Sequence, residues 1–373
     1  MLRVCGVTFD HTNNYGSCLQ AFALQKAVEK TELNGESCEY RVLYLRKLFL
    51  HQMKEYNASL FRRVSDFQHL RFLKFEKEYM KYIETENMSM DSLQQLNKEF
   101  DAFVCGSDVI WNEDLNFGRT VYFLDFAEKY KFSYAASFGT DRVSDEYIRR
   151  CSKMISDLDE ISVRETTSKK LLESHIDKAV EVVPDPVLLL DREDWETIVS
   201  RVTVPKKKYI FAYFTHINPK AQVFIKRLQK ETGLRVINAI WVSNLRIMIE
   251  NRIFLVQTPQ KWLALLKNAE YIVTNSFHAS VLSCVFHRRF FTFVNGEPDK
   301  GVNIRMYDYL KKLGLESRMF SAVPEVIDTS NCSFDSADRV NEELKMKGLD
   351  YLHRNLQNAC NESLKINNHY KSM

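Results

Sequence analysis

One histidine stands where a predicted strand passes into a predicted helix, and this position suits proton-transfer chemistry. The β-branched and aromatic run Tyr271–Thr274 predicts a strand, and Asn275 and Ser276 are turn and helix-capping residues. His278 then falls in the first turn of the helix, where unpaired backbone N–H groups and the helix dipole favour an anion. An imidazole there can act as a general acid or base. The alternative is a core or capping histidine.

Two arginines also lie where predicted strands end or helices begin. Arg164 follows the predicted strand Ile161–Val163 and opens a helix, so its guanidinium would project from the carboxyl edge of the sheet. Arg305 begins a later helix, with Lys300 just ahead of it. A guanidinium binds a carboxylate or phosphate through two parallel hydrogen bonds, which a lysine cannot do. The alternatives are a structural salt bridge for Arg164, for instance with Glu165, and a solvated surface position for Arg305.

Two turns in the first half of the chain carry side chains that suit a sugar. The first turn links a strand to a strong helix and consists of Asn14, Tyr15 and Gly16. Its glycine permits close approach of the backbone, so the helix N-terminus can receive an anion or a sugar hydroxyl. The second turn offers a hydroxyl, a carboxylate, an aromatic face and an amide, from Ser107, Asp108, Trp111 and Asn112. Sugars are bound by such combinations of stacking and polar contacts, although Asp108 could serve only as a helix N-cap.

The elements that would position these residues alternate between short apolar runs and helical patterns, which predicts an α/β fold with mainly parallel sheets. The predicted strands of the first half are residues 2–8, 40–45, 102–105, 132–137, 161–163 and 179–183. Those of the second half are residues 209–215, 235–238, 271–274 and 290–294. A chain of 373 residues exceeds the usual size of one core. We expect domains at 1–204 and 205–335, and an amphipathic helix at 336–373 that packs back on the first domain.

Composition narrows the class of protein. A net charge of +3 from 52 basic and 49 acidic residues does not indicate a nucleic-acid-binding protein. The eight cysteines have no CxxC spacing, and several, such as Cys5, Cys105 and Cys284, lie in apolar segments, as is typical of a reducing compartment. The first residues lack the features of a signal peptide, and no apolar run approaches the roughly 18 residues that span a bilayer. We expect a cytoplasmic protein without a metal cluster.

Residues 48–82 depart from the alternating pattern because they combine basic and aromatic side chains. A helix of this kind could lie in a membrane interface or hold an acidic or sugar substrate. The alternative is a surface helix that packs its aromatic stripe on the core and leaves its charges in solvent. Only this segment leads us to expect peripheral contact with the inner face of a membrane.

The order of these segments resembles the polysaccharide pyruvyl transferase family. The recurring elements, between about residues 4 and 320, are NNYGSCLQAFALQ, CGSDVIWN, SFGT, SVRE, VPDPVLLL, TNSFHASVLSCVF and NIRMYDYLKKLGL. The resemblance implies a GT-B-like fold, with two Rossmann-like domains facing across a cleft. It implies transfer of a pyruvyl group from phosphoenolpyruvate to two hydroxyls of a sugar, as a ketal. His278 would be the acid/base residue, and Arg164 and Arg305 would bind the donor with Ser276, Lys300 being a further candidate.

The implied chemistry suits the residues. Phosphoenolpyruvate is a compact trianion, for which two arginines and a helix N-terminus are an apt receptor. The acceptor would be a lipid-linked or nucleotide-linked sugar of a capsular or exopolysaccharide precursor, held mainly by the first domain, and no cofactor is expected. Two other functions remain open: a nucleotide-sugar glycosyltransferase on the same fold, and a non-catalytic protein that binds anions or glycans. A dehydrogenase is disfavoured because the GxGxxG fingerprint is missing.

Overall fold

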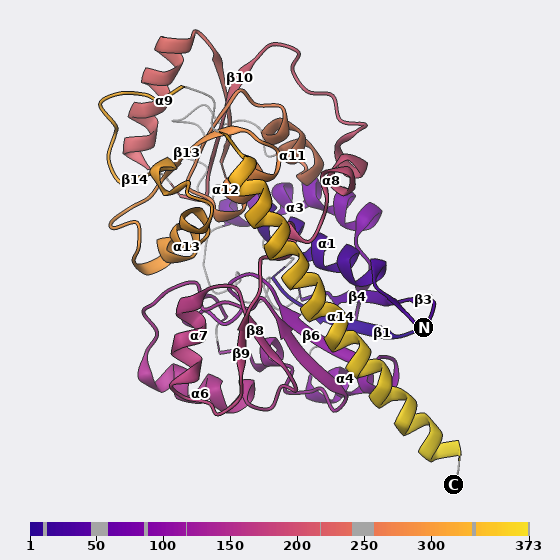
Figure 1. Ribbon diagram of the computed structural model, residues 1–373. Helices are drawn as coiled ribbons and strands as arrows, with labels where there is room; N and C mark the ends of the chain where they lie inside the picture. The colour runs from indigo at the N-terminus through magenta and orange to yellow at the C-terminus, as the bar shows by residue number, and fades with distance from the viewer. Residues whose placement is uncertain are drawn as a thin grey trace.

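The chain folds into two parallel β-sheets surrounded by helices (Figure 1). The computed structural model describes residues 1–9, 13–45, 59–85, 89–116, 118–216, 218–240, 257–329 and 333–371. Within these ranges the side chains of residues 59–68, 240 and 366–371 are not described.

The first sheet is formed by five parallel strands in the order β5-β4-β1-β6-β7. In chain order its strands are β1 (Arg3–Val7), β4 (Glu39–Leu43), β5 (Tyr82–Ile83), β6 (Ala102–Gly106) and β7 (Tyr130–Tyr134). A short parallel pair, β8 (Ile161–Val163) and β9 (Val180–Val182), joins it through isolated bridges beside β7. A two-stranded antiparallel hairpin, β2 (Glu32–Leu33) and β3 (Glu36–Ser37), lies between α1 and β4 in the chain.

The second sheet also has five parallel strands, in the order β11-β10-β12-β13-β14. These strands are β10 (Tyr209–Phe214), β11 (Arg235–Ile240), β12 (Tyr271–Thr274), β13 (Arg289–Phe293) and β14 (Met319–Phe320). Every residue of β10, YIFAYF, is buried, as expected for a central strand of a parallel sheet that is covered on both faces. Parallel sheets in both halves confirm the predicted α/β class.

Helices connect the strands and cover the sheets. The α-helices are α1 (Tyr15–Lys30), α3 (Ser59–Tyr79), α4 (Met90–Gln94), α5 (Glu113–Asn116), α6 (Asp145–Ile155), α7 (Thr166–Glu173), α8 (Arg192–Val199), α9 (Pro219–Thr232), α11 (Pro259–Lys267), α12 (Phe277–Val285), α13 (Ile304–Lys312) and α14 (Asp335–Lys371). The 3₁₀ helices are η1 (Gln95–Lys98), η2 (Thr120–Phe123), η3 (Pro186–Leu188), η4 (Gly301–Asn303) and η5 (Glu316–Arg318). Their limits follow capping rules. Helix α9 begins after Asn218, whose side chain accepts from the Ala221 N–H, and it ends before Gly233, the C-cap with φ 68°.

Most predicted strands match observed ones within a few residues, and the main difference has a local cause. The run of residues 132–137 was expected to be one strand, but β7 ends at Tyr134. Ala135 has φ 51°, in the left-handed region, so the extended conformation cannot continue through it. The short strands β2, β3, β5 and β14 were not predicted, because two residues carry no periodic signal.

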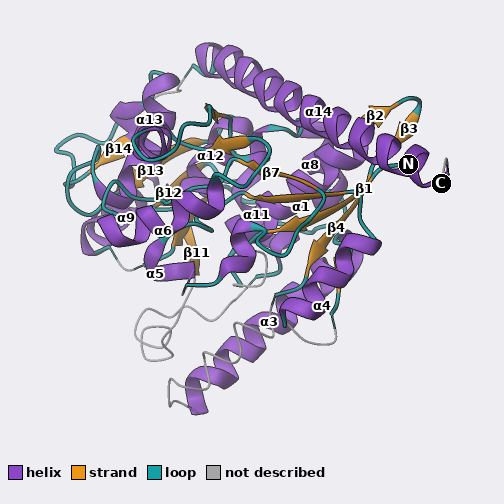
Figure 2. Cartoon of the chain, turned by 90° about the horizontal axis from the view of Figure 1, so that it is seen from below, coloured by secondary structure: helices purple, strands orange, loops and turns teal. Residues whose placement is uncertain are grey.

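Helix α14 runs along both halves of the molecule (Figures 1 and 2). It contacts β7 and β2 of the first half and α12 of the second. One hydrophobic core cluster likewise includes residues from both halves, among them Tyr15, Trp195 and Trp262. The two sheets are therefore held in one packed body.

The segment of residues 48–82 is described only from residue 59, and its side chains only from residue 69. In that part of α3, Phe72 and Phe75 are buried while Lys74 and Lys77 are exposed, as the surface-helix alternative predicts. The basic and aromatic residues before position 69 lie outside the side chains that the structure describes. No helix among the described residues is long and apolar enough to cross a membrane.

Candidate functional site

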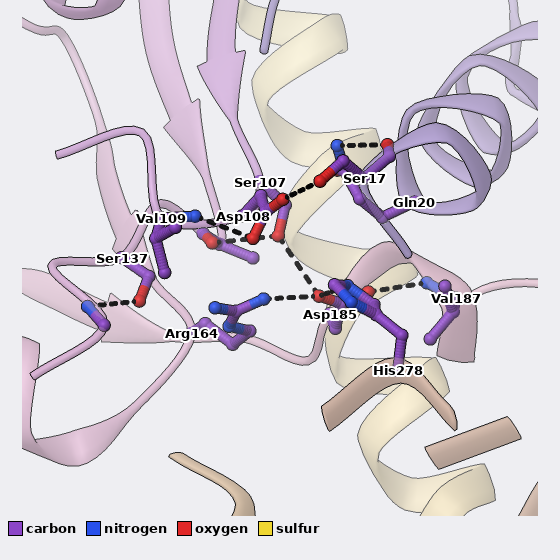
Figure 3. A network of polar contacts seen from close by, with 12 residues as sticks. Ser17, Gln20, Ser107, Asp108, Val109, Ser137, Arg164, Asp185, Val187 and His278 are labelled. Carbon is purple, nitrogen blue, oxygen red and sulfur yellow. Dashed lines mark hydrogen bonds and ion pairs between the residues drawn. The ribbon is translucent and has the colours of Figure 1, made fainter. Parts of the chain in front are cut away.

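Asp185 lies between two of the predicted site residues. It follows β9 and caps η3, where its Oδ1 accepts a hydrogen bond from the Val187 N–H at 3.1 Å. Its Oδ2 accepts a hydrogen bond from Arg164 Nη1 at 2.8 Å and lies 3.2 Å from His278 Nε2 (Figure 3). Ser107 Oγ is 3.5 Å from the same oxygen. One buried carboxylate thus joins the ends of β6 and β8 to helix α12 of the other half.

The charge of this carboxylate is set by its neighbours. Asp185 is 1% exposed, and burial alone would raise its pKa. The contacts with His278 and Arg164 outweigh burial and hold the pKa of Asp185 well below its usual range. Asp185 is therefore ionised at neutral pH and can orient both partners.

His278 lies in the first turn of α12, directly against the first half of the molecule. Ser276 is the N-cap of this helix, and its Oγ accepts from the Ala279 N–H at 3.4 Å. A Cβ on Gly16 would collide with His278 Nδ1, so α1 can approach the imidazole only because residue 16 is a glycine. The two ring nitrogens therefore face Asp185 and Gly16, and the histidine is buried at the junction of the two halves.

Arg164 and Arg305 both lie over the ring of Phe277. Their guanidinium carbons are 4.7 Å and 5.7 Å from the ring centroid. Arg164 Nε and Nη2 are buried without a hydrogen-bond partner, although Nε is 3.6 Å from Glu165 Oε2. Arg305 forms no hydrogen bond or ion pair with a residue that the structure describes. The two guanidinium groups thus keep N–H donors that an anion could use.

The pKa values of the two arginines differ in direction. Burial lowers the pKa of Arg305, and repulsion from Arg164 lowers it further. Burial acts in the same direction on Arg164, but Asp185, Glu165 and Asp108 outweigh it and raise its pKa. Both groups stay charged because an arginine pKa is far above neutrality. An anion bound between them would relieve their mutual repulsion.

The two arginines open into a cavity of about 260 Å³, called here the α13–α14 cavity. Its lining comes from the loops after β8 and β9, from η3, and from α12, α13 and α14, and comprises Arg164, Glu165, Thr166, Val182, Val183, Pro184, Asp185, Leu188, Phe277, Arg305, Asp308, Tyr309, Lys312, Leu344 and Lys347. A pocket of this size suits a small anion rather than a nucleotide sugar. A larger hollow of about 790 Å³ between β9 and α14 contains none of the predicted site residues.

Ser107 and Asp108 face this group from the first half (Figure 3). Asp108 has φ 68°; its Oδ2 accepts from Ser17 Oγ at 2.5 Å and its Oδ1 from the Val109 N–H at 2.9 Å. Ser107 Oγ donates to the Ala135 carbonyl at 3.1 Å. Asp108 therefore ties its own turn to α1 and is not the N-cap of α5, which begins only at Glu113.

Trp111 and Asn112, which were expected to contact a sugar, make contacts within the protein. Trp111 is fully buried, donates from Nε1 to the Tyr122 carbonyl at 3.1 Å, and stacks on Phe123 with centroids 5.9 Å apart. Its ring has no exposed face, because the apolar side chains around it form the core. Asn112 Nδ2 donates to the Phe138 carbonyl at 2.7 Å, and Asn112 Oδ1 accepts two backbone N–H groups at the start of α5.

Asn14 and Tyr15 are likewise occupied. Asn14 is the N-cap of α1, and its Oδ1 accepts from the Gly16 N–H at 2.9 Å. Tyr15 is buried, with its ring stacked on Trp262 at 5.2 Å and its hydroxyl bonded to both backbone groups of Gln257 at 2.9 Å. Tyr15 thus joins the two halves and has no free hydroxyl for an acceptor. Of the predicted first turn, only Gly16 touches the group around His278.

Lys300 does not join the two arginines. Its ammonium group is largely exposed and pairs with Glu297, which raises the pKa of Lys300. It lies outside the lining of the α13–α14 cavity. Of the two cations considered for this position, Arg305 is therefore the one beside Arg164.

A family model for polysaccharide pyruvyl transferase matches residues 14–297. The chain belongs to this family. The matched range contains Arg164, Asp185 and His278, and it ends before Arg305. Among curated protein sequences, none matches the chain significantly.

Solved structures that match the chain include proteins whose descriptions name UDP or a UDP-sugar epimerase. This polysaccharide pyruvyl transferase family member matches a Listeria monocytogenes protein assigned as a UDP-N-acetylglucosamine 2-epimerase with a TM-score of 0.50 and 11% identity, over 97% of this chain and 92% of that one. S. aureus MnaA, solved with UDP, matches with a TM-score of 0.49 and 13% identity, over 94% of this chain and 98% of that one. The first match shows the GT-B-type fold, as the resemblance implied.

The sequence of this pyruvyl transferase family member did not reveal two residues at the centre of the site. Asp185 stands in the motif VPDPVLLL, between two prolines and directly after a strand, and this placement was the available signal. Phe277 reads as an ordinary apolar helix residue, and only the structure shows two guanidinium groups against its ring. Both roles depend on contacts between distant segments, which spacing along the chain does not encode.

Proposed function

We propose that this protein transfers the pyruvyl group of phosphoenolpyruvate to two hydroxyls of a sugar in a surface polysaccharide precursor and releases phosphate. The observation that carries the proposal is the buried Nε and Nη2 pair of Arg164, which has no hydrogen-bond partner and lines a small cavity with Arg305. Unpaired buried donors are costly, so a site that keeps them is suited to a ligand that accepts from both. The acceptor in this proposal is a lipid-linked or nucleotide-linked sugar in the cytoplasm.

The donor's chemistry matches the cavity. A planar carboxylate or two phosphate oxygens can accept from Nε and Nη2 in parallel, and Arg305 would neutralise the remaining negative charge. The ring of Phe277 beneath both guanidinium groups supports cation–π contact and keeps water from that side. The same arrangement leaves no comparable place for a nucleotide base within about 260 Å³.

In the proposed reaction the proton comes from His278, whose Nε2 meets the cavity lining at Asp185. The proton is added to the methylene carbon, and the oxygen of the first hydroxyl bonds to C2 as it loses its own proton. Phosphate leaves with the bonding electrons, and the second hydroxyl closes the ketal. The two hydroxyls lose two protons. One returns to His278 and replaces the proton given to carbon, and the other leaves on phosphate. Asp185 orients the imidazole through its contact with Nε2.

The test is incubation with phosphoenolpyruvate and a panel of galactosyl, mannosyl and N-acetylhexosamine acceptors. We expect phosphate release and an acceptor heavier by one pyruvic acid less one water, seen by mass spectrometry. His278→Ala should lower kcat by about 10²- to 10⁴-fold. Arg164→Lys keeps the positive charge opposite Asp185 but loses the two parallel N–H donors of the guanidinium, so it should weaken donor binding. The control Arg150→Ala, at a surface arginine over Tyr147, should change neither kcat nor donor binding.

Three results would count against the proposal. Full turnover in His278→Ala and Arg164→Lys would show that His278 is not the proton donor and that Arg164 does not bind the donor. Saturable binding of a nucleotide sugar, without binding of phosphoenolpyruvate, would favour a glycosyltransferase. Tight donor binding with no product across the panel would favour a non-catalytic binding protein.

A further inference from the structure

The α13–α14 cavity has a second pair of cations at its outer end. Lys312 of α13 and Lys347 of α14 line the cavity together with the two arginines, and both lysines are exposed. Neither forms a hydrogen bond or ion pair with a described residue. Partial burial of its ammonium group lowers the pKa of Lys312, and Lys347 acts in the same direction while Asp308 opposes it. The cavity therefore reaches the surface at a point where positive charge is concentrated.

The walls of this opening are fixed by two helices. Tyr309 of α13 donates a hydrogen bond to Asn341 of α14 at 3.0 Å. Leu344 and Lys347 of α14 line the cavity, and Gly348 lies so close to Pro184 and Leu189 that a Cβ there would be 3.0 Å and 2.7 Å from them. Helix α14 is thus pressed onto the loop that carries Asp185. The opening lies between α13 and α14.

The residues on the acceptor side lie elsewhere. Gly16, Ser107 and Asp108 do not belong to the lining of the cavity, and neither does His278. Asp185 links them to the cavity, because its Oδ2 contacts Arg164 on one side and His278 and Ser107 on the other (Figure 3). A sugar bound at the turn of Gly16 and Asp108 would approach from the opposite side.

We infer that phosphoenolpyruvate reaches Arg164 and Arg305 through the opening between α13 and α14, guided by Lys312 and Lys347, while the acceptor arrives from the junction of the two sheets. This inference rests on the proposed function. An excess of positive charge around an opening raises the association rate of an anionic ligand. The lining carries four cations, Arg164, Arg305, Lys312 and Lys347, and three carboxylates, Glu165, Asp185 and Asp308, so cations are in excess.

The first experiment measures how fast phosphoenolpyruvate associates, by stopped-flow intrinsic fluorescence of the full-length protein. The double variant Lys312→Gln/Lys347→Gln is compared with Lys311→Gln/Lys345→Gln, which removes the same charge from the same two helices outside the cavity lining. At about 0.01 M ionic strength we expect the first variant to associate about threefold to tenfold more slowly than the second. In about 1 M salt the difference should disappear, because charges are then screened within about 3 Å.

The second experiment blocks the opening. Leu344→Trp replaces an aliphatic side chain of the cavity wall by a bulky indole ring. It should slow the association of phosphoenolpyruvate and weaken its binding at every salt concentration. Circular dichroism and thermal unfolding check that the variant is folded, and Met346→Trp, an exposed neighbour outside this cavity, is its control.

The outcomes separate this inference from the proposed function. If the unaltered protein does not bind phosphoenolpyruvate, the proposed function fails. If it binds, but the two lysine variants associate at equal rates and folded Leu344→Trp binds as before, the donor uses another route and the inference is wrong.

Discussion

A single carboxylate oxygen organises the site at the scale of residues. Asp185 Oδ2 accepts from Arg164 and contacts His278, while these two residues come from different halves of the chain. Sequence reasoning reached His278 and Arg164 because each opens a helix after a strand, and open α/β sheets bind ligands there. It could not reach Asp185, because the role of this residue arises only when the loop after β9 meets α12.

Removing this carboxylate should destabilise the protein. Asp185→Ala removes the carboxylate that is hydrogen-bonded to the buried Arg164 and leaves it only the longer contact with Glu165. Loss of one member of a buried ion pair costs about 3–5 kcal/mol. We expect a fall of that size in the free energy of unfolding at pH 7, measured in urea. Asp177→Ala, at an exposed aspartate, should change it by no more than about 0.5 kcal/mol. A small effect of Asp185→Ala would show that the pair contributes little.

The difference between the unaltered protein and Asp185→Ala should depend on pH. Because the folded state lowers the pKa of Asp185, its stabilising contribution is complete above the unfolded value of about 3.9 and is lost as pH falls towards the folded value. Unfolding curves should show a constant difference from pH 7 to about pH 5 and a shrinking one below about pH 4. A difference that stays constant down to pH 3 would contradict this assignment.

At the scale of elements, α14 determines how closely the loop of Asp185 is held. The amphipathic pattern predicts this helix, and the structure gives it bounds of Asp335–Lys371. The pattern also shows Gly348 as an unexplained glycine within a helix. The structure explains it, because Tyr134, Leu189 and Pro184 leave no room for a side chain there.

Gly348→Ala should therefore reverse the usual effect of removing a helical glycine. Helix propensity alone would stabilise the variant by about 1 kcal/mol. The added Cβ would lie 2.6 Å from Tyr134 Oη and 2.7 Å from Leu189 Cδ2, and such overpacking costs about 1–3 kcal/mol. We expect a net loss of stability in urea unfolding and weaker donor binding, because the loop before Asp185 must shift. The control Glu362→Ala, at an exposed residue of the same helix, should change neither stability nor donor binding. A Gly348→Ala variant more stable than the unaltered protein would show that the side chains around Gly348 move aside at little cost.

At the scale of the whole molecule, the two halves meet through side chains that are packed as closely as those of a hydrophobic core. The sequence predicted two sets of strands but not the surfaces by which they meet. Tyr15 was expected to bind the acceptor because of its place after the first strand, whereas its ring and hydroxyl are used against Trp262 and Gln257. Contacts of this kind depend on the packing of distant residues, and no local pattern announces them.

Tyr15→Phe tests how much this junction depends on one hydroxyl. The ring would still stack on Trp262, but both backbone groups of Gln257 would lose the hydrogen bond to this hydroxyl, at a cost of about 1–3 kcal/mol. We expect a lower free energy of unfolding and faster limited proteolysis. Tyr307→Phe, whose hydroxyl makes no hydrogen bond with a described residue, is the matched control. Equal stability of the two variants would mean that water replaces the hydroxyl of Tyr15 without loss.

The contact of Gly16 with His278 affects whether, in the proposed reaction, the pyruvyl group is transferred to the sugar or lost to water. An activated C2 reacts with any nucleophile that reaches it, and water is always present at high concentration. In this protein the imidazole is covered by the backbone of α1, so solvent cannot stand beside the proton donor on that side. In the proposed reaction, a residue without a side chain thus helps to decide whether the donor becomes a ketal or is hydrolysed to pyruvate.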